Sequence, residues 1–449
     1  MTLLKLRIEN LELRILTSVT LACALLCNQD ANAEGWSLEQ CVDYAIEHNI
    51  EVRQRMLDVR QGELAVREQK DQVLPNLSGY GSESFSFGRG LTADNTYANR
   101  NTSSFSVGAQ LSLPLFQGLR VVRGVKYSNT SLRALVEQSE AVKDDVTVNV
   151  IAQYLQALYA RENLEVARMS LNVSLDELHR REQLLEAGKI PELDLYEAKA
   201  QVSRDELTVV NAVNDSTIAM LDLANLLNLE NDGSFDITPL LEDIDEAIPS
   251  VEQVWSAMLI DNHSLQAANI QRDAAAQNVL VSKSGYLPTL SFNAGLGTNY
   301  YKTSGFENGT FGDQMKHNFS KSLGFSLNIP IFDGFSTRNS VNRAKLQQLN
   351  ADINLENTRQ TLYKTITSAH AQAIAAERKE KTSDVAVEST KAAFDAMRVK
   401  YDNGRANATE YEKSKADYTN ALAERLQARY ERMLRTRILR YYENGSTDR

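Results

Sequence analysis

Proline is scarce in this 449-residue sequence, which contains seven, and its distribution is uneven. None occurs between Gly118 and Leu185 or between Gly334 and Asn403, where alanine, leucine, glutamate, lysine, arginine and glutamine are abundant. Because proline breaks helices and these residues favour them, each stretch predicts one very long helix. At a rise of ~1.5 Å per residue, each helix would be about 100 Å long, which no compact domain core needs.

Groups that carry chemistry are also missing. The sequence has no phosphate loop, dinucleotide fingerprint or nucleophile elbow, so we expect neither an enzyme nor a bound cofactor. The net charge of −11, with no basic stripe, argues against a nucleic-acid partner. The five histidines are scattered, and none stands at ligand spacing from another histidine or a cysteine, so no metal site is expected. They are His48, His179, His263, His317 and His370.

The longest apolar run near the start, Ile15 to Leu26, is too short to span a bilayer as a helix. It follows Lys5, Arg7 and Arg14 and precedes the small residues Ala31 to Ala33. This order predicts a signal peptide over residues 1–33 and an exported chain. The alternative is a plain buried helix, because Glu9 and Glu12 are unusual in such a leader.

Cysteine is rare as well, with three in the chain. Cleavage after Ala33 would remove Cys23 and Cys27 and leave Cys41 alone, so no disulfide could form within the mature chain. Lipidation of Cys23 or Cys27 is the alternative processing route, although the residues before both cysteines fit that signal poorly.

The rest of the chain is an internal repeat. Leu74-Pro75 recurs as Leu287-Pro288 at an offset of 213, and Pro114 recurs as Pro330 at an offset of 216. We therefore expect one structural repeat over residues 34–240 and a second over 241–449, separated by an acidic linker. Each repeat predicts a helix, a strand, a loop, a strand, a very long helix, a turn and a second long helix. The first helices should run from capping boxes at Ser37 and Ser250 to the Leu-Pro pairs.

Apolar residues alternate with serine, glycine and asparagine in the predicted strands. In one strand the apolar positions are Phe105, Val107, Ala109, Leu111 and Leu113, and in another they are Leu290, Phe292, Ala294 and Leu296. Strands of about 9 to 11 residues with one apolar face match an outer-membrane barrel. Four strands cannot close a barrel, so several copies of the chain must combine. A soluble sandwich joined to coiled coils is the alternative, but its exposed face would be expected to carry charges.

Each long helix ends at a glycine followed by a cation, in LLEAGKIPELDL (Leu184 to Leu195) and KYDNGRANATEY (Lys400 to Tyr411). Glycine stops a helix, whereas proline or an Asn-x-x-Glu sequence starts one, so these segments predict two tight helical hairpins.

Together, the duplicated plan, the Leu-Pro pairs, the Leu-x-x-Pro-Leu/Ile-Phe-x-Gly strand exits and the paired glycine turns resemble the TolC family of outer-membrane efflux proteins. The resemblance extends from about Ser37 to Leu439. It implies a mixed α and membrane β fold, in which a homotrimer forms one β-barrel and a periplasmic α-helical tunnel. The exit residues, Pro114, Gly118, Pro330 and Gly334, would then mark the bends from strand to helix.

The same resemblance implies that the hairpin tips bind a periplasmic adaptor. The tip residues here are Gly188, Lys189, Ile190, Pro191, Gly404, Arg405, Ala406 and Asn407. Family members also carry acids near these turns, at the closed end of the tunnel, which assigns Asp194, Glu197 and Glu410 to a periplasmic gate. Lys413 occupies a place where an acid is expected, which puts a second acidic ring in doubt. All these residues also fit ordinary roles at helix ends.

The resemblance thus implies an exit duct in the outer membrane of a Gram-negative bacterium. The duct would export small toxic molecules passively, passed on by an inner-membrane transporter and the adaptor, with the barrel in contact with outer-membrane lipid. Two alternatives remain from the sequence: a type I protein secretion duct, and a periplasmic coiled-coil protein without a pore.

Overall fold

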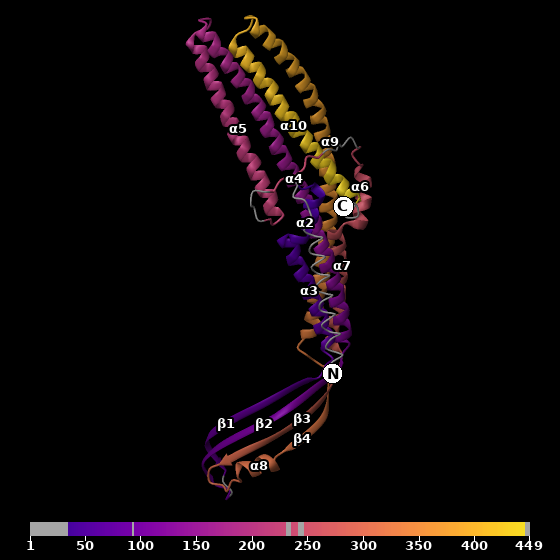
Figure 1. The fold of residues 1–449 in the computed structure, drawn as a ribbon. Helices are drawn as coiled ribbons and strands as arrows, with labels where there is room; N and C mark the ends of the chain where they lie inside the picture. Colours follow the sequence, from indigo (N-terminus) through magenta and orange to yellow (C-terminus); the bar gives the residue numbers. More distant parts are fainter. Residues whose placement is uncertain (1–34, 92–93, 230–234, 241–246, 445–449) are drawn as a thin grey trace, which may run out of the picture.

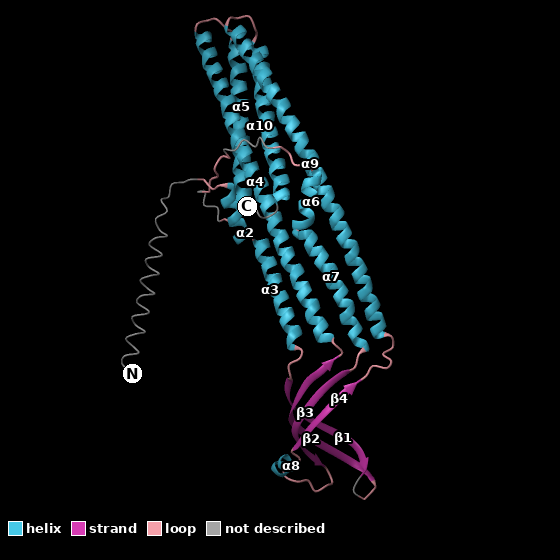
Figure 2. Ribbon diagram, turned by 90° about the vertical axis from the view of Figure 1, so that its right-hand side faces the viewer, coloured by secondary structure: helices cyan, strands magenta, loops and turns pink. Residues whose placement is uncertain are grey.

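The computed structural model describes residues 35–91, 94–229, 235–240 and 247–444. The chain is elongated, with a β-sheet at one end and two helical hairpins at the other, joined by a thicker band of helices (Figures 1 and 2). The predicted signal peptide, residues 1–33, lies outside the described residues. None of the described helices combines the length and the hydropathy that a membrane-crossing helix requires.

Four antiparallel strands form the sheet in the order β1 (Asn76–Leu91), β2 (Tyr97–Gln117), β3 (Thr289–Thr303) and β4 (Ser320–Asn328). The two strands of each repeat pair with one another, and β2 pairs with β3 across the repeats. A short helix, α8 (Phe311–His317), interrupts the connection between β3 and β4, where the sequence predicted only a loop.

Side chains of the sheet separate into two faces, as the alternation predicted. Leu111 pairs with Ala294, which pairs with Leu323, so these apolar residues share one face. On the other face, hydroxyl groups face one another across the strands: Ser82 Oγ lies 2.8 Å from Ser106 Oγ. The sheet is therefore amphipathic, and its outer strands β1 and β4 each have one strand neighbour in the described chain.

Two consecutive helices precede the strands of each repeat: α2 (Leu38–His48) and α3 (Ile50–Asp71) in the first, α6 (Val251–Asp261) and α7 (His263–Lys283) in the second. The predicted capping boxes are present at Ser37 and Ser250. The prediction of one helix up to each Leu-Pro pair is wrong, because Asn49 and Asn262 end one helix and cap the next. Asparagine favours this role because its side-chain oxygen accepts hydrogen bonds from free N–H groups. A short 3₁₀ turn, Ser284–Tyr286, follows α7.

The long helices are α4 (Arg120–Glu186) and α9 (Ser336–Asp402), each of 67 residues and so about 100 Å long. Each returns through a tight turn into a second helix, α5 (Glu192–Leu226) or α10 (Ala408–Asn444). The fold prediction of four strands per chain with very long helical hairpins is therefore confirmed.

Strand and long helix meet at two successive residues with positive φ in each repeat. Gly118 and Leu119 have φ of 59° and 63°, and Gly334 and Phe335 have φ of 64° and 66°. Pro114 lies further back, inside β2, where the pairing with β3 is irregular. A proline has no N–H for the ladder, which accounts for the irregularity. The sharp change of direction thus falls on the glycine and its successor.

The main hydrophobic core lies where α2, α4 and the end of α5 meet, around the fully buried Tyr154 and Leu158. The described part of the acidic linker packs into this core, since Ile237 is buried beside Trp36. Tyr154 donates hydrogen bonds to the carbonyl oxygens of Trp36 and Thr238, at 3.0 and 2.6 Å. This segment of the linker is therefore attached to the first repeat.

Candidate gate and docking site at the hairpin tips

Both hairpin tips begin with the same helix-ending turn. Gly188 and Gly404 have φ of 65° and 69°. After each glycine, the next backbone N–H donates to a carbonyl oxygen of the preceding helix. Lys189 donates to Leu184 and Arg405 donates to Lys400, both at 2.8 Å. This is the Schellman motif, which satisfies the last carbonyl groups of a helix and favours glycine at its left-handed position. A Cβ on either glycine would meet no atom within 4 Å, so both turns face open space.

The second helix of each hairpin starts differently. Pro191 precedes α5 and makes no side-chain cap, whereas Asn407 and Glu410 cap α10 reciprocally. The Glu410 N–H donates to Asn407 Oδ1 at 2.8 Å, and the Asn407 N–H donates to Glu410 Oε2 at 3.0 Å. Glu410, one of the predicted gate residues, is therefore a helix cap in the structure.

The structure does not join the predicted gate residues to one another within the chain. Asp194 is half-buried, and Glu197, Glu410 and Lys413 are exposed. In the described part of the chain, none of the four takes part in an ion pair. Ile190 and Ala406, within the two turns, are half-buried.

A polar cluster that the sequence did not predict joins the two hairpins just below the tips. Arg181, with 2% of its surface exposed, donates through Nε to Glu177 Oε1 at 2.9 Å. Tyr401, at the end of α9, donates its hydroxyl to the same Glu177 oxygen at 2.7 Å. Arg181 Nη1 donates to the main-chain oxygen of Asp194 at 2.9 Å, so the cluster also positions the start of α5.

Glu412 on α10 completes this cluster, because its carboxylate lies 4.0 Å from Arg181 Nη2. Burial raises the pKa of Glu412 above its usual range, although Lys415 and Arg181 act in the opposite direction. Burial and the hydrogen bond to Glu177 raise the pKa of Tyr401 to about 12. At neutral pH, Tyr401 is therefore a neutral hydrogen-bond donor.

A second buried cluster lies further from the tips. Lys415, 4% exposed, places Nζ 2.8 Å from Asp205 Oδ2 and also donates to Ser174 Oγ. Ser174 in turn donates to Asp205 at 2.5 Å. The three residues come from α10, α5 and α4, so this ion pair connects three helices. A surface pair, Arg180 with Asp402 at 2.7 Å, adds another link between α4 and α9.

Weak signals for these residues exist in the sequence. Glu177 and Arg181 have the i, i+4 spacing of a helical ion pair, and Lys415 recurs as Lys199 at the repeat offset of 216. Both patterns are common on solvated helices, so neither could reveal a buried cluster. These side chains are buried because α4 packs against α10. Sequence spacing alone does not reveal this long-range contact.

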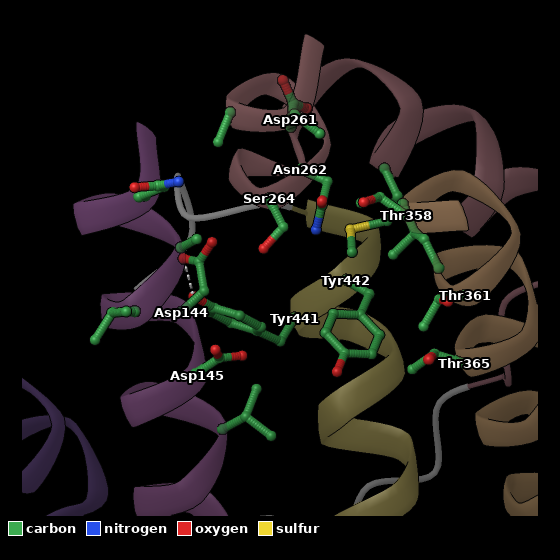
Figure 3. Close-up of a pocket in the computed structure, with 18 of the residues that line it drawn as sticks. Asp144, Asp145, Asp261, Asn262, Ser264, Thr358, Thr361, Thr365, Tyr441 and Tyr442 are labelled. Carbon is green, nitrogen blue, oxygen red and sulfur yellow. Dashed lines mark hydrogen bonds between the residues drawn. The ribbon is translucent and has the colours of Figure 1, made fainter. Parts of the chain in front are cut away.

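A cavity lies far from the tips, among the helices of the central band (Figure 3). It has a volume of about 710 Å³ and lies between α4, α6, α7, α9 and α10. Asp144, Asp145 and Asp261 contribute carboxylates, and Tyr441 donates its hydroxyl to Asp144 at 2.6 Å. Burial, followed by the nearby Asp144 and Glu51, raises the pKa of Asp145. Such a polar cavity is suited to holding water.

Metal-ligating groups are not gathered at any of these places. Among the described residues, no three histidine, cysteine, aspartate or glutamate side chains are arranged to hold a metal ion. His263 instead lies 2.9 Å from Glu137 Oε2, as a link between α7 and α4.

Known proteins match this chain over most of its length. The family described as outer membrane efflux protein matches residues 41–229 and 254–440. The outer membrane protein TolC of Vibrio cholerae is 25% identical over 314 residues, 68% of this chain and 69% of the relative. The outer membrane protein OprJ of Pseudomonas aeruginosa is 25% identical over 403 residues, 86% and 79% of the two chains. The crystal structure of the CmeC outer membrane channel from Campylobacter jejuni aligns with a TM-score of 0.75 at 18% identity, covering 92% of this chain and 87% of that one.

Proposed function

This chain belongs to the outer membrane efflux protein family, and we propose that three copies of it form a passive exit duct. The family prediction and the outer-membrane location of a Gram-negative bacterium are confirmed. The family and its solved neighbours are channel proteins. We further propose that this chain catalyses no reaction. An inner-membrane transporter would supply the energy for export.

One observation supports the trimer: the amphipathic sheet has four strands, and among the described residues its two outer edges are unpaired. Three copies would supply twelve strands, enough to close a barrel with its apolar face toward lipid and its serine-rich face toward the lumen. The pairing of Leu111 with Ala294 between the repeats provides the template for closure. The equivalent pairing at the repeat offsets would join Leu327 of one copy to Gly81 of the next. This register keeps the apolar residues of the two strands on one face.

The repeats themselves, residues 34–240 and 241–449, are part of the proposal. Apart from the 3₁₀ turn and α8 in the second repeat, their described elements recur in the same order, and α4 and α9 have equal lengths. In a ring of three chains, six hairpins of similar shape would then alternate around a helical tunnel in the periplasm. Small toxic molecules would pass along this tunnel and leave through the barrel.

The two exposed turns would bind a periplasmic adaptor protein. Their support is the shared geometry of Gly188 and Gly404, each followed by a cation in open space at the far end of the molecule (Figure 1). Asp194, Glu197, Glu410 and Lys413 lie at the same end and would surround the gate in a ring.

Substitution at Gly404 tests the docking assignment. A valine side chain at this position would clash with its own backbone in the left-handed conformation at a cost of ~1–2 kcal/mol, but with no neighbouring residue. We expect Gly404→Val to retain heat-modifiable trimers in the outer membrane and to lose both efflux and cross-linking to the adaptor. Gly404→Asn is the matched control and should retain all of these, because asparagine adopts this conformation readily.

Cross-linking of Gly404→Val at the native level would show that the adaptor binds elsewhere. Cell fractionation tests the function as a whole. A chain found only in the soluble periplasm, without trimers, would contradict the exit duct.

A further inference from the structure

The single chain displays one of the two helix junctions that a ring of three copies requires. Within the chain, the hairpins meet through α4 and α10, leaving α5 and α9 on the outer sides (Figure 1). Because α9 is the repeat counterpart of α4, and α5 that of α10, the second junction must join α9 of one copy to α5 of the next. Residues of the second junction can therefore be identified from those of the first.

In the central band, α7 packs against both α4 and α9, whereas its counterpart α3 packs against α4 alone among these long helices. The contact of α7 with α4 includes a hydrogen bond between His263 Nδ1 and Glu137 Oε2 at 2.9 Å. At the repeat offsets of 213 and 216, the residues equivalent to His263 and Glu137 are Ile50 and Ile353. Both isoleucines are more than half exposed in the single chain, at 57% and 59%. The repeat thus brings together two exposed apolar side chains.

Near the tips, charged residues of the first junction likewise correspond to uncharged residues in the second. Arg181 and Glu412, which meet within the chain, correspond to Met397 and Tyr196. Tyr196 on α5 is 62% exposed, and Met397 on α9 is half-exposed.

The rest of the tip cluster changes in the same way. Glu177 and Tyr401 correspond to Ala393 and Leu185, so the hydrogen bond between hairpins also disappears. The contacts of Arg181 with Glu412 and of Glu177 with Tyr401 therefore both have uncharged counterparts in the second junction.

The buried lysine has a lysine as its counterpart in the second junction, but its two partners are not retained. Lys415 corresponds to Lys199, but its partners Asp205 and Ser174 correspond to Ala421 and Thr390. Lys199 would consequently meet no carboxylate in the next copy at this position. It is exposed in the single chain and can keep its charge in water.

We propose that copies of this chain join through apolar versions of two contacts of the in-chain junction, with Ile50 packed on Ile353 of the next copy and Tyr196 on Met397. The proposal rests on the trimer of the proposed function. Burial of apolar surface supplies a driving force for joining separate chains. The buried cluster of Arg181 and Glu177 belongs to the junction whose two sides are already connected in one chain.

Paired cysteines test the two contacts directly in full-length protein in outer membranes. The variants are Ile50→Cys with Ile353→Cys, and Tyr196→Cys with Met397→Cys, each treated with a short bis-maleimide. Both should give covalent dimers and trimers on denaturing gels. The native Cys41 should not interfere, because it is buried and burial raises the pKa of its thiol to about 12.

Matched controls combine Ile50→Cys or Tyr196→Cys with Val385→Cys, which is 62% exposed on the same helix α9. Val385 is 12 residues from Met397, or ~18 Å along the helix, so these pairs should not link copies. Each single-cysteine variant should remain a monomer on the gel.

The outcomes separate this inference from the proposed function. Loss of the non-covalent trimer in the unmodified protein would overturn both. Intact trimers in which the designed pairs link no better than the Val385 pairs would overturn the inference alone. Products of monomer mass with an internal link would also overturn it, because the paired residues would then meet within one chain.

Discussion

At the scale of single residues, the buried ion pair of Lys415 with Asp205 should contribute more to the stability of the helices than an exposed ion pair does. Both side chains are largely buried, at 5% and 13% exposure. Asp205→Ala would leave the lysine buried without a counter-charge, which typically costs ~3–5 kcal/mol. We expect hydrogen exchange of the amides in α5 and in the adjoining part of α10 to accelerate accordingly.

An exposed pair provides the control. Arg425 and Asp384 are half-exposed and 2.6 Å apart, so Asp384→Ala should cost less than ~1 kcal/mol. The double variant Lys415→Met with Asp205→Leu should recover most of the lost protection, since it removes both charges. Equal rates of hydrogen exchange in Asp205→Ala and Asp384→Ala would show that the buried pair contributes no more to stability than the exposed pair.

Glu412 gives a pH dependence of defined sign. Its pKa is raised in the folded chain, mainly by burial, so the folded state binds the proton more tightly than the unfolded state. Its contribution to stability is therefore greatest below the unfolded pKa of about 4.3, and it falls as the pH rises through the folded pKa. Glu412→Gln should raise the thermal midpoint of the helical part at pH 8 more than at pH 4.5. A smaller gain at pH 8 would contradict the burial argument.

What the sequence predicts about single residues depends on how local their interactions are. The glycines at 188 and 404 and the cap at Asn407 were identifiable, because helix ends depend on residues within one turn. Lys415 was noticed only as a repeated lysine, since its partners Ser174 and Asp205 lie more than 200 positions away. Long-range packing decides which charged residues become buried.

At the scale of elements, the two faces of the sheet predict unequal effects of charge. Leu327 lies opposite Leu290 on the apolar face, and Ser326 lies opposite Ser291 on the other. An arginine on the lipid side costs ~2–4 kcal/mol at mid-membrane. Leu327→Arg should therefore lower the amount of assembled trimer on semi-native gels far more than Ser326→Arg. Equal losses would refute the assigned faces.

Elements with a strong period were predictable, whereas breaks and insertions were less so. Alternation marked the strands, and the absence of proline marked α4 and α9 to within two residues of their observed ends. The break at Asn49 was missed, because a single capping asparagine within a helical sequence gives little signal. Helix α8 was missed because it has only seven residues, in a segment that otherwise has turn composition.

At the scale of the whole molecule, the unequal junctions indicate where the tunnel would open. Within a chain the tips are held by Glu177, Arg181, Tyr401 and the pair of Lys415 with Asp205. Between chains, the proposed contact of Tyr196 with Met397 contains no ion pair, so its surfaces can slide without separating buried charges. We therefore expect the two hairpins of one chain to move together and the gaps between chains to widen.

Cleavable cross-links distinguish the two junctions in planar bilayers. A link between Tyr196→Cys and Met397→Cys should hold the trimer at low conductance even with the adaptor present, and reduction of the link should restore opening. The matched in-chain link joins Arg180→Cys to Asp402→Cys, whose native side chains lie 2.7 Å apart on α4 and α9. This link should leave opening unchanged, because it connects helices that already move as one unit. Opening blocked by the in-chain link but not by the link between copies would place the moving surface between the hairpins of a single chain.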